Sequence, residues 1–199
     1  VTLQGAGTLN SSATSTTTLV GTPALSGKTW NQSGTLEIGG AHRVLIANGG
    51  VLNNLAGGVI NDSTTNTWPI EGNGSAATFT NTGTFNKNSA TTQHFNFDGF
   101  TNAAGGTFNI SSGTFQLTQG TATDSGTYHI GAGSTLSVTG STRTFNNASF
   151  TGTGVLGQTG GTMEFATNKT FVAGGPTLLL TGGIVQGAGN LTVNNALTL

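Results

Sequence analysis

Residues 106–117 hold two copies of one short unit, Gly106-Thr107-Phe108-Asn109-Ile110 and, two residues later, Gly113-Thr114-Phe115-Gln116-Leu117. Each copy has a glycine and a threonine, followed by an apolar, a polar and an apolar residue. In an extended chain successive side chains point to opposite faces, so the two apolar residues of a copy point the same way. Each unit therefore predicts a short strand with one buried face.

The same unit recurs along most of the 199-residue chain. Further copies are Gly34–Ile38, Gly126–Ile130 and Gly161–Phe165, and looser ones are Ser134–Val138, Gly189–Val193 and Ala196–Leu199. The copies are evenly spaced, because Tyr128 follows Phe108 by 20 residues and Leu136 follows Phe115 by 21. Periods of 20 residues or more are typical of stacked repeats that bury their apolar residues only against neighbouring repeats.

We therefore expect an all-β fold, a β-solenoid of about nine coils in a single domain covering residues 1–199. At the usual strand spacing it would be about 43 Å long. The periodicity is weak over residues 62–77, which we expect to be a loop excursion. The pattern predicts a stacked interior made of Leu36, Ile38, Val59, Phe85, Phe108, Ile110, Phe115, Leu117, Tyr128, Ile130, Leu136, Val138, Met163, Phe165, Leu178, Leu180, Leu191 and Val193.

Composition excludes several functional classes. Only 6% of the residues are charged and the net charge is −1, so the five Lys and Arg residues are too few to bind a row of phosphates. We expect no nucleic-acid partner and no membrane insertion, since the longest apolar runs are far shorter than a membrane span. The chain has no cysteine, which removes disulfides, zinc–thiolate sites and thiol nucleophiles. We expect no cofactor and no metal site.

The repeats between Phe100 and Val193, among them Gly-Gly-Thr-Phe-Asn-Ile and Gly-Ala-Gly-Ser-Thr-Leu-Ser-Val, resemble those of large bacterial surface proteins. These are the filamentous haemagglutinin-like adhesins and the passenger domains of autotransporters. The resemblance implies a right-handed parallel β-helix. It also implies an extracellular or bacterial cell-surface location, and a role as a stalk, adhesin or matrix component.

Parallel β-helices also include enzymes that cleave polysaccharides, and glycoside hydrolysis generally needs two carboxyl groups that face each other across the bond. The six acids are dispersed, and Glu37 and Glu164 occupy outward positions of their units. The most suggestive cluster is the strand His94–Asp98, whose alternation places His94 and Asp98 on the face opposite two phenylalanines. His94 and Asp98 are therefore candidates for contact with a glycan, but two strand steps separate them and we assign no catalytic residue.

Trp68 is the third candidate, because an exposed aromatic ring in a loop can stack on a sugar. Two hypotheses remain open. In the first, the chain is a non-catalytic structural or adhesive segment of a bacterial surface protein, whose partner is a second copy stacked end to end or a surface glycan. In the second, it is a carbohydrate-binding or polysaccharide-cleaving β-helix, a lyase or glycosidase.

The first hypothesis draws on the two ends of the chain. Val1–Asn10 closely matches Ile184–Thr192, so the first and last coils are alike. Neither end carries a charge cluster that would cap a solenoid. An uncapped coil exposes unpaired backbone groups that can template another strand. We therefore expect that the chain can stack end to end into a fibre.

Overall fold

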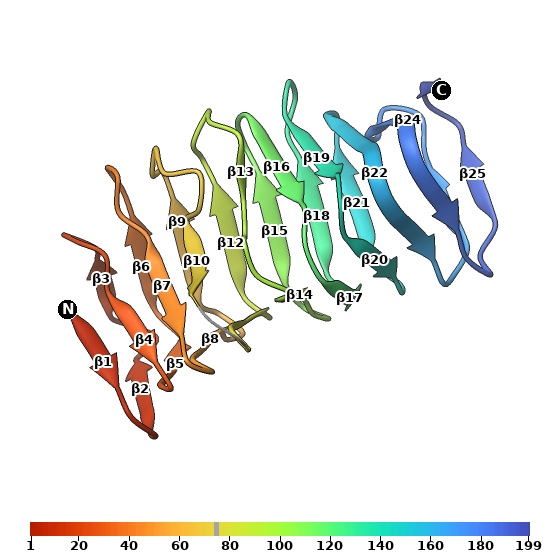
Figure 1. The fold of residues 1–199 in the computed structure, drawn as a ribbon. Coiled ribbons are helices and arrows are strands. Elements are labelled where there is room, and N and C mark those ends of the chain that lie inside the picture. Colours follow the sequence, from red (N-terminus) through yellow and green to blue (C-terminus); the bar gives the residue numbers. More distant parts are fainter. Residues whose placement is uncertain (74–75) are drawn as a thin grey trace.

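The computed structural model describes residues 1–73 and 76–199, and it is a parallel β-solenoid of about nine coils. The coils stack into a rod, with the N-terminus at one end and the C-terminus at the other (Figure 1). All paired strands in the described part of the chain are parallel, and none of the described residues is helical. The described residues accordingly include no helix that could span a membrane. The predicted fold class is confirmed.

Each coil places one strand on each of three faces. The first face contains β1 (Thr2–Gln4), β4 (Ala24–Ser26), β7 (Val44–Ala47), β10 (Ile70–Asn73), β13 (Gln93–His94), β16 (Thr114–Leu117), β19 (Thr135–Val138), the first halves of β22 (Val155–Phe165) and β24 (Thr177–Gln186), and β26 (Leu197–Thr198). The second contains β2 (Thr8–Ser11), β5 (Thr29–Gln32), β8 (Val51–Asn54), β11 (Thr78–Asn81), β14 (Gly99–Asn102), β17 (Thr121–Asp124), β20 (Thr142–Phe145) and the second halves of β22 and β24. The third contains β3 (Thr16–Thr18), β6 (Thr35–Ile38), β9 (Val59–Asp62), β12 (Thr84–Lys87), β15 (Thr107–Ile110), β18 (Thr127–Ile130), β21 (Ser149–Gly152), β23 (Lys169–Phe171) and β25 (Leu191–Val193).

The core is a column of stacked side chains inside the coils. Phe85 pairs in register with Phe108, and their rings stack with centroids 4.6 Å apart. Phe108 in turn pairs with Tyr128, which is fully buried. Because every coil presents its inward residues at the same height, equivalent residues from successive coils meet.

Most of the predicted interior is buried, with one misplaced residue. Val59 is only partly buried, and its neighbour Ile60 is fully buried in its place. Because Val59 and Ile60 are both apolar, the sequence did not show which of them points inward. The pairing of Ile60 with the buried Leu36 shows that it is Ile60. Leu180, Leu191 and Val193 are partly buried because they lie in the last coils.

Residues 62–77 were predicted to form a loop excursion, and this prediction is wrong in part. Asp62 ends β9, and the stretch contains β10, which pairs with β7. Its described residues outside strands are 63–69 and 76–77, and residues 74–75 lie outside the described residues. Gly72 concealed the strand, because it occupies the inward position where an apolar side chain was expected. A Cβ there would clash with the side chain of Phe97 from the following coil.

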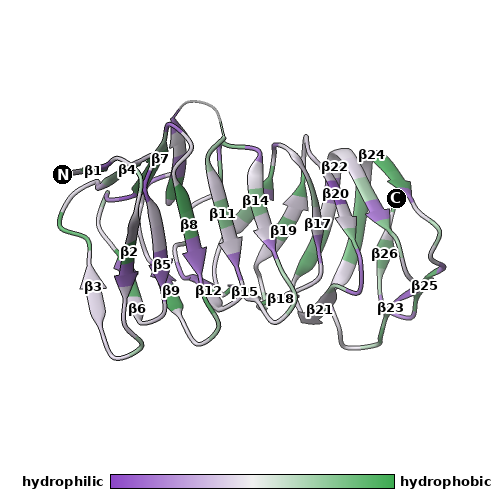
Figure 2. Ribbon diagram, turned by 90° about the horizontal axis from the view of Figure 1, so that it is seen from below, coloured by the Kyte–Doolittle hydropathy of each residue, from purple (hydrophilic) through white to green (hydrophobic). Residues whose placement is uncertain are grey.

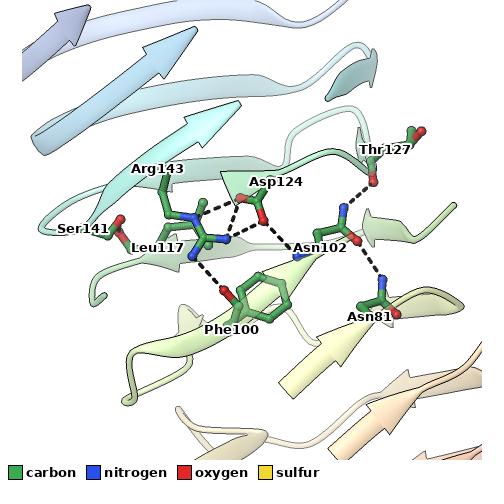
Figure 3. Close-up of polar contacts among 8 residues, drawn as sticks. All are labelled: Asn81, Phe100, Asn102, Leu117, Asp124, Thr127, Ser141 and Arg143. Atoms are coloured by element: carbon green, nitrogen blue, oxygen red, sulfur yellow. Dashed lines mark hydrogen bonds and ion pairs between the residues drawn. The ribbon is translucent and has the colours of Figure 1, made fainter. Parts of the chain in front are cut away.

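A column of polar side chains runs inside the second face. The Nδ2 of Asn54 donates to Oδ1 of Asn81, and the Nδ2 of Asn81 donates to Oδ1 of Asn102, both at 2.8 Å. The same amides also donate to backbone oxygens of the third face, as Asn102 does to Thr127 (Figure 3). Buried polar groups are costly unless they are hydrogen-bonded. The Nδ2 groups of all three asparagines have partners, whereas Oδ1 of Asn54, at the start of the ladder, has none among the described residues.

Candidate functional site

Trp68 and His94, two of the three residues singled out in the sequence, are in direct contact. Trp68 lies in the loop before β10, and His94 ends β13 in the next coil. The Nε1 of Trp68 donates to Nε2 of His94 at 2.8 Å, and the rings are edge to face with centroids 6.1 Å apart. The sequence pattern named both residues but not their contact, which depends on the length of the coil between them.

The contact with Trp68 determines the tautomer of the His94 imidazole. Because Nε2 of His94 accepts a hydrogen bond, the neutral ring carries its proton on Nδ1. Burial lowers the pKa of His94 and so favours this neutral form. Nε2 of His94 is occupied by Trp68, and Nδ1 is buried without a partner among the described residues, so the pair offers a ligand the sides of two rings rather than an imidazole nitrogen.

Asp98 is not part of this contact. Phe95 and Phe97 point into the core, and His94 and Asp98 point outward, as the alternation predicted. Asp98 lines a separate hollow of about 500 Å³, together with Asn96, Thr78 and Gln119. Among the described residues no ion pair joins Asp98 to His94. The three candidate residues therefore lie in two neighbouring places rather than in one site.

The other acids are bound individually into the structure. Asp124 forms a buried ion pair with Arg143, and Glu71 pairs with Arg43 on the first face. Glu37 accepts a hydrogen bond from Asn61 at 2.7 Å, and Glu164 accepts one from Thr144 at 3.2 Å. In the part of the chain that the structure describes, no cluster of three or more His, Cys, Asp or Glu side chains could hold a metal ion.

Asp62 and Lys87 are adjacent in register and both are fully buried. Burial raises the pKa of Asp62 to about 7 and lowers that of Lys87 to about 8. The Nζ of Lys87 donates to the carbonyls of Ser89, Thr91 and Ser112, and Oδ1 of Asp62 accepts from the backbone N–H of Thr64. These hydrogen bonds hold together the corner that follows the third face. Both side chains are therefore used within the fold and are not accessible to a ligand.

The first coil lies at the N-terminal end of the rod (Figure 1). A hollow of about 520 Å³ lies there, and its walls are mainly apolar and carry no charged side chain: Val1, Leu3, Leu9, Ser11, Thr17, Thr18, Leu19, Val20, Gly21, Thr22, Pro23 and Trp30. These residues belong to the first coil and to the start of the second. Val1 is 87% exposed and Val20 is 90% exposed.

The C-terminal end has the same character. Its exposed apolar residues are Ile184, Val185, Leu197 and Leu199. Figure 2 shows this end of the rod with apolar colouring on β24 and β26. No family model, curated protein or solved structure matches this chain.

Proposed function

We propose that this chain is a non-catalytic structural segment of a bacterial surface protein, an extracellular rod that carries or forms adhesive filaments. The observation that carries the proposal is one continuous stack of about nine parallel coils around a single column of buried apolar side chains. A solenoid repeat is stabilised by its neighbours, and such a stack makes an elongated rod of the kind that a stalk requires. The resemblance of the repeats to filamentous adhesins and autotransporter passengers agrees with this role.

The arrangement of the acids supports the non-catalytic part of the proposal. Glycosidases generally need two carboxyl groups about 5–10 Å apart on either side of the scissile bond. Here Asp124 and Glu71 are neutralised by arginines, and Asp62 is buried away from solvent. Glu37 and Glu164 are hydrogen-bonded to neighbouring side chains. Among the described residues that line its hollow, Asp98 is the only acid.

Two measurements test this function. The purified chain is incubated with a panel of bacterial and plant polysaccharides, and the release of reducing ends or of unsaturated products is measured. We expect none. Release that is lost in Asp98→Asn or His94→Ala would contradict the proposal. Antibodies against the chain should also label intact cells of the source bacterium, with a periplasmic protein as the unlabelled control.

A second candidate function is glycan binding, and the Trp68–His94 contact favours it. Partly exposed aromatic rings with a fixed polar edge are suited to stacking on sugars. In this case retention of the rod on an immobilised glycan should fall in Trp68→Ala and stay unchanged in Trp30→Phe, whose ring is buried. If the wild type is not retained on any glycan in the panel, this candidate function is excluded.

A further inference from the structure

We propose that the hollow beside Asp98 is a saccharide-binding site on the side of the rod, which takes one uncharged sugar residue of a longer glycan. The hollow measures about 500 Å³, within the range of about 300–1,000 Å³ that small-ligand sites usually have. Neither Trp68 nor His94 is among the described residues that line it. The proposal therefore adds a separate binding site to the structural role and does not depend on that role.

The hollow lies where the regular stacking of the coils is interrupted. In the described part of the chain, β10 ends one sheet on the first face and β13 begins another, and the same change occurs between β14 and β17 on the second face. The strand β13 has two residues, whereas β10 and β16 on either side of it have four each. Residues 95–98 lie outside any strand, at the corner between these two faces. The hollow thus belongs to a local break in the repeat.

The backbone and a buried ring set much of the shape of the hollow. Gly99 pairs with Thr78 and has no side chain to fill the space beside it. A Cβ on Gly99 would overlap the carbonyl oxygen of Ala77, so a larger residue would require the backbone to move. Phe97 is held inward over Gly72, whose missing Cβ leaves room for it. A site that is shaped before the ligand arrives loses less free energy on binding.

Four polar side chains line the hollow, those of Thr78, Asn96, Asp98 and Gln119. Oδ1 of Asn96 accepts a hydrogen bond from the backbone N–H of Gly72 at 2.8 Å, which orients the amide and leaves Nδ2 to donate to a ligand. Asp98 and Gln119 are exposed, and Asp98 forms no ion pair with a described residue. The hollow therefore presents amide and hydroxyl donors beside carboxylate and amide acceptors.

These groups match a sugar better than an ion. Each hydroxyl group of a sugar both donates and accepts, so the carboxylate accepts from two of them while the amides donate to others. Among the described lining residues Asp98 is the only charged one, so an anion would meet a negative charge without a compensating cation. A calcium or magnesium ion would find a single carboxylate there.

The hollow also offers an apolar contact. Phe97 and Ala77 line it and are 7% and 5% exposed. A sugar ring has an apolar C–H face as well as hydroxyl groups at its edge, and an aromatic side chain packs well against such a face. An uncharged sugar residue therefore uses both the polar and the apolar parts of the lining.

Titration with neutral oligosaccharides tests the site. The probes are cellotetraose, laminaritetraose, maltotetraose and N-acetylchitotetraose, added at millimolar concentrations and followed by calorimetry. We expect at least one of them to bind, with a Kd that rises about tenfold or more in Asp98→Ala, because hydrogen bonds to a charged group are lost. Glu164→Ala is the matched control, since Glu164 also faces outward but lies outside the hollow. Its Kd should change by less than about twofold.

A variant that fills the hollow tests its location without removing the carboxylate. Thr78→Trp places a large side chain there from the outward face of β11 and should abolish binding. Thr80→Trp is the control, because Thr80 is the next outward residue of the same strand and does not line the hollow. Both variants should melt close to the wild type, which shows that the fold is kept. Binding that persists in Thr78→Trp contradicts the site.

NMR spectroscopy locates the bound sugar in the wild type. The side-chain NH₂ signals of Asn96 and Gln119 should shift as the oligosaccharide is added. Those of Asn86 and Asn109, which form hydrogen bonds on the third face, should stay in place. Shifts at the third-face asparagines alone are incompatible with the proposal.

The remaining outcomes also decide between the alternatives. Binding that is lost in Trp68→Ala but unchanged in Asp98→Ala would place the glycan on the aromatic pair and overturn the hollow, leaving the second candidate function in place. Binding of a glucosamine tetramer but of no neutral probe would identify a cation site instead. The absence of any binding would also overturn the proposal. Polysaccharide cleavage and cell labelling are separate measurements, so this failure is distinguishable from failure of the structural function.

Discussion

Arg143 and Asp124 form a buried, bidentate ion pair at the place where the sheet of the second face is interrupted. The Nε of Arg143 lies 2.9 Å from Oδ2 of Asp124, and its Nη2 lies 2.6 Å from Oδ1. The strand β17 does not pair with β14 below it. Instead, Nη1 of Arg143 donates to the carbonyl of Phe100, and Oδ1 of Asp124 accepts from the N–H of Asn102 (Figure 3). The ion pair therefore replaces the missing backbone ladder.

Removing one partner of this pair should be costly. Arg143→Met leaves the carboxylate of Asp124 buried without its counter-charge and leaves the Phe100 carbonyl without its donor. We expect a loss of about 3–5 kcal/mol in the free energy of unfolding, measured by denaturant titration. The double variant Arg143→Met with Asp124→Leu should recover part of that loss. A single variant within 1 kcal/mol of the wild type, by the usual range for exposed pairs, would contradict this account.

The buried asparagine ladder should contribute more to the free energy of unfolding than the hydrogen bonds between asparagines on the outer surface. Asn81→Ala removes the acceptor of Asn54 and the donor of Asn102, both buried, and should cost about 1–3 kcal/mol for the groups left unpaired. On the outer surface, Nδ2 of Asn53 donates a comparable hydrogen bond to Oδ1 of Asn31 at 2.9 Å. Asn53→Ala should stay within about 0.5 kcal/mol, because water replaces the lost partner. Equal costs in thermal unfolding would argue against the difference.

Two glycines with nearly the same positive φ allow the cost of backbone strain to be measured separately from the cost of a steric clash. Gly57 has φ of 85° with open space around it, and Gly152 has φ of 86°, but its added Cβ would overlap the carbonyl of Ile130. Gly57→Ala should cost about 1 kcal/mol, from the left-handed backbone alone. Gly152→Ala should exceed it by about 2 kcal/mol or more, because backbone atoms of the coil below must shift. Chemical denaturation of both variants measures the difference.

Asp62 should make the stability of the rod depend on pH. Its pKa is raised from 3.8 to about 7, so the folded state binds a proton that the unfolded state releases between these values. The stability contributed by the neutral carboxyl is fully present below pH 3.8 and is lost as the pH rises through 7, at about 1.4 kcal/mol per unit. Asp62→Asn should match the wild type at acid pH and exceed it near pH 7.5. A wild type whose melting temperature rises over this interval relative to the variant would contradict the assignment.

The Trp68–His94 hydrogen bond should break on acidification. Protonation of His94 at Nε2 removes the acceptor of the Trp68 N–H. Because burial lowers the pKa of His94 below 6.5, the bond and the stability it provides are present above pH 6.5 and lost as the pH falls through the folded value. Tryptophan fluorescence should follow this titration, with a midpoint below pH 6.5. His94→Gln, which cannot titrate, should give a flat profile; a sloping one would assign the change to another group.

Local patterning determined the strands, the solenoid and nearly all of its interior. Alternation between apolar and polar residues follows from the geometry of a single extended chain, so the pairs Phe108 and Ile110, or Phe95 and Phe97, could be assigned to the inside before any fold was known. The pattern failed where a residue departed from it, at Gly72, and where two apolar neighbours left the phase open, at Val59.

The tertiary structure alone decided which residues from different coils meet. Trp68 contacts His94 across 26 residues, and Arg143 reaches Phe100 across 43, because coil lengths vary and each extra residue shifts the register. Likewise, the sequence shows that segments 2–10 and 184–192 match, but only the strand pairing shows that they lie one face apart. Alternation is a property of neighbouring residues, whereas register depends on the summed lengths of all the corners between two strands.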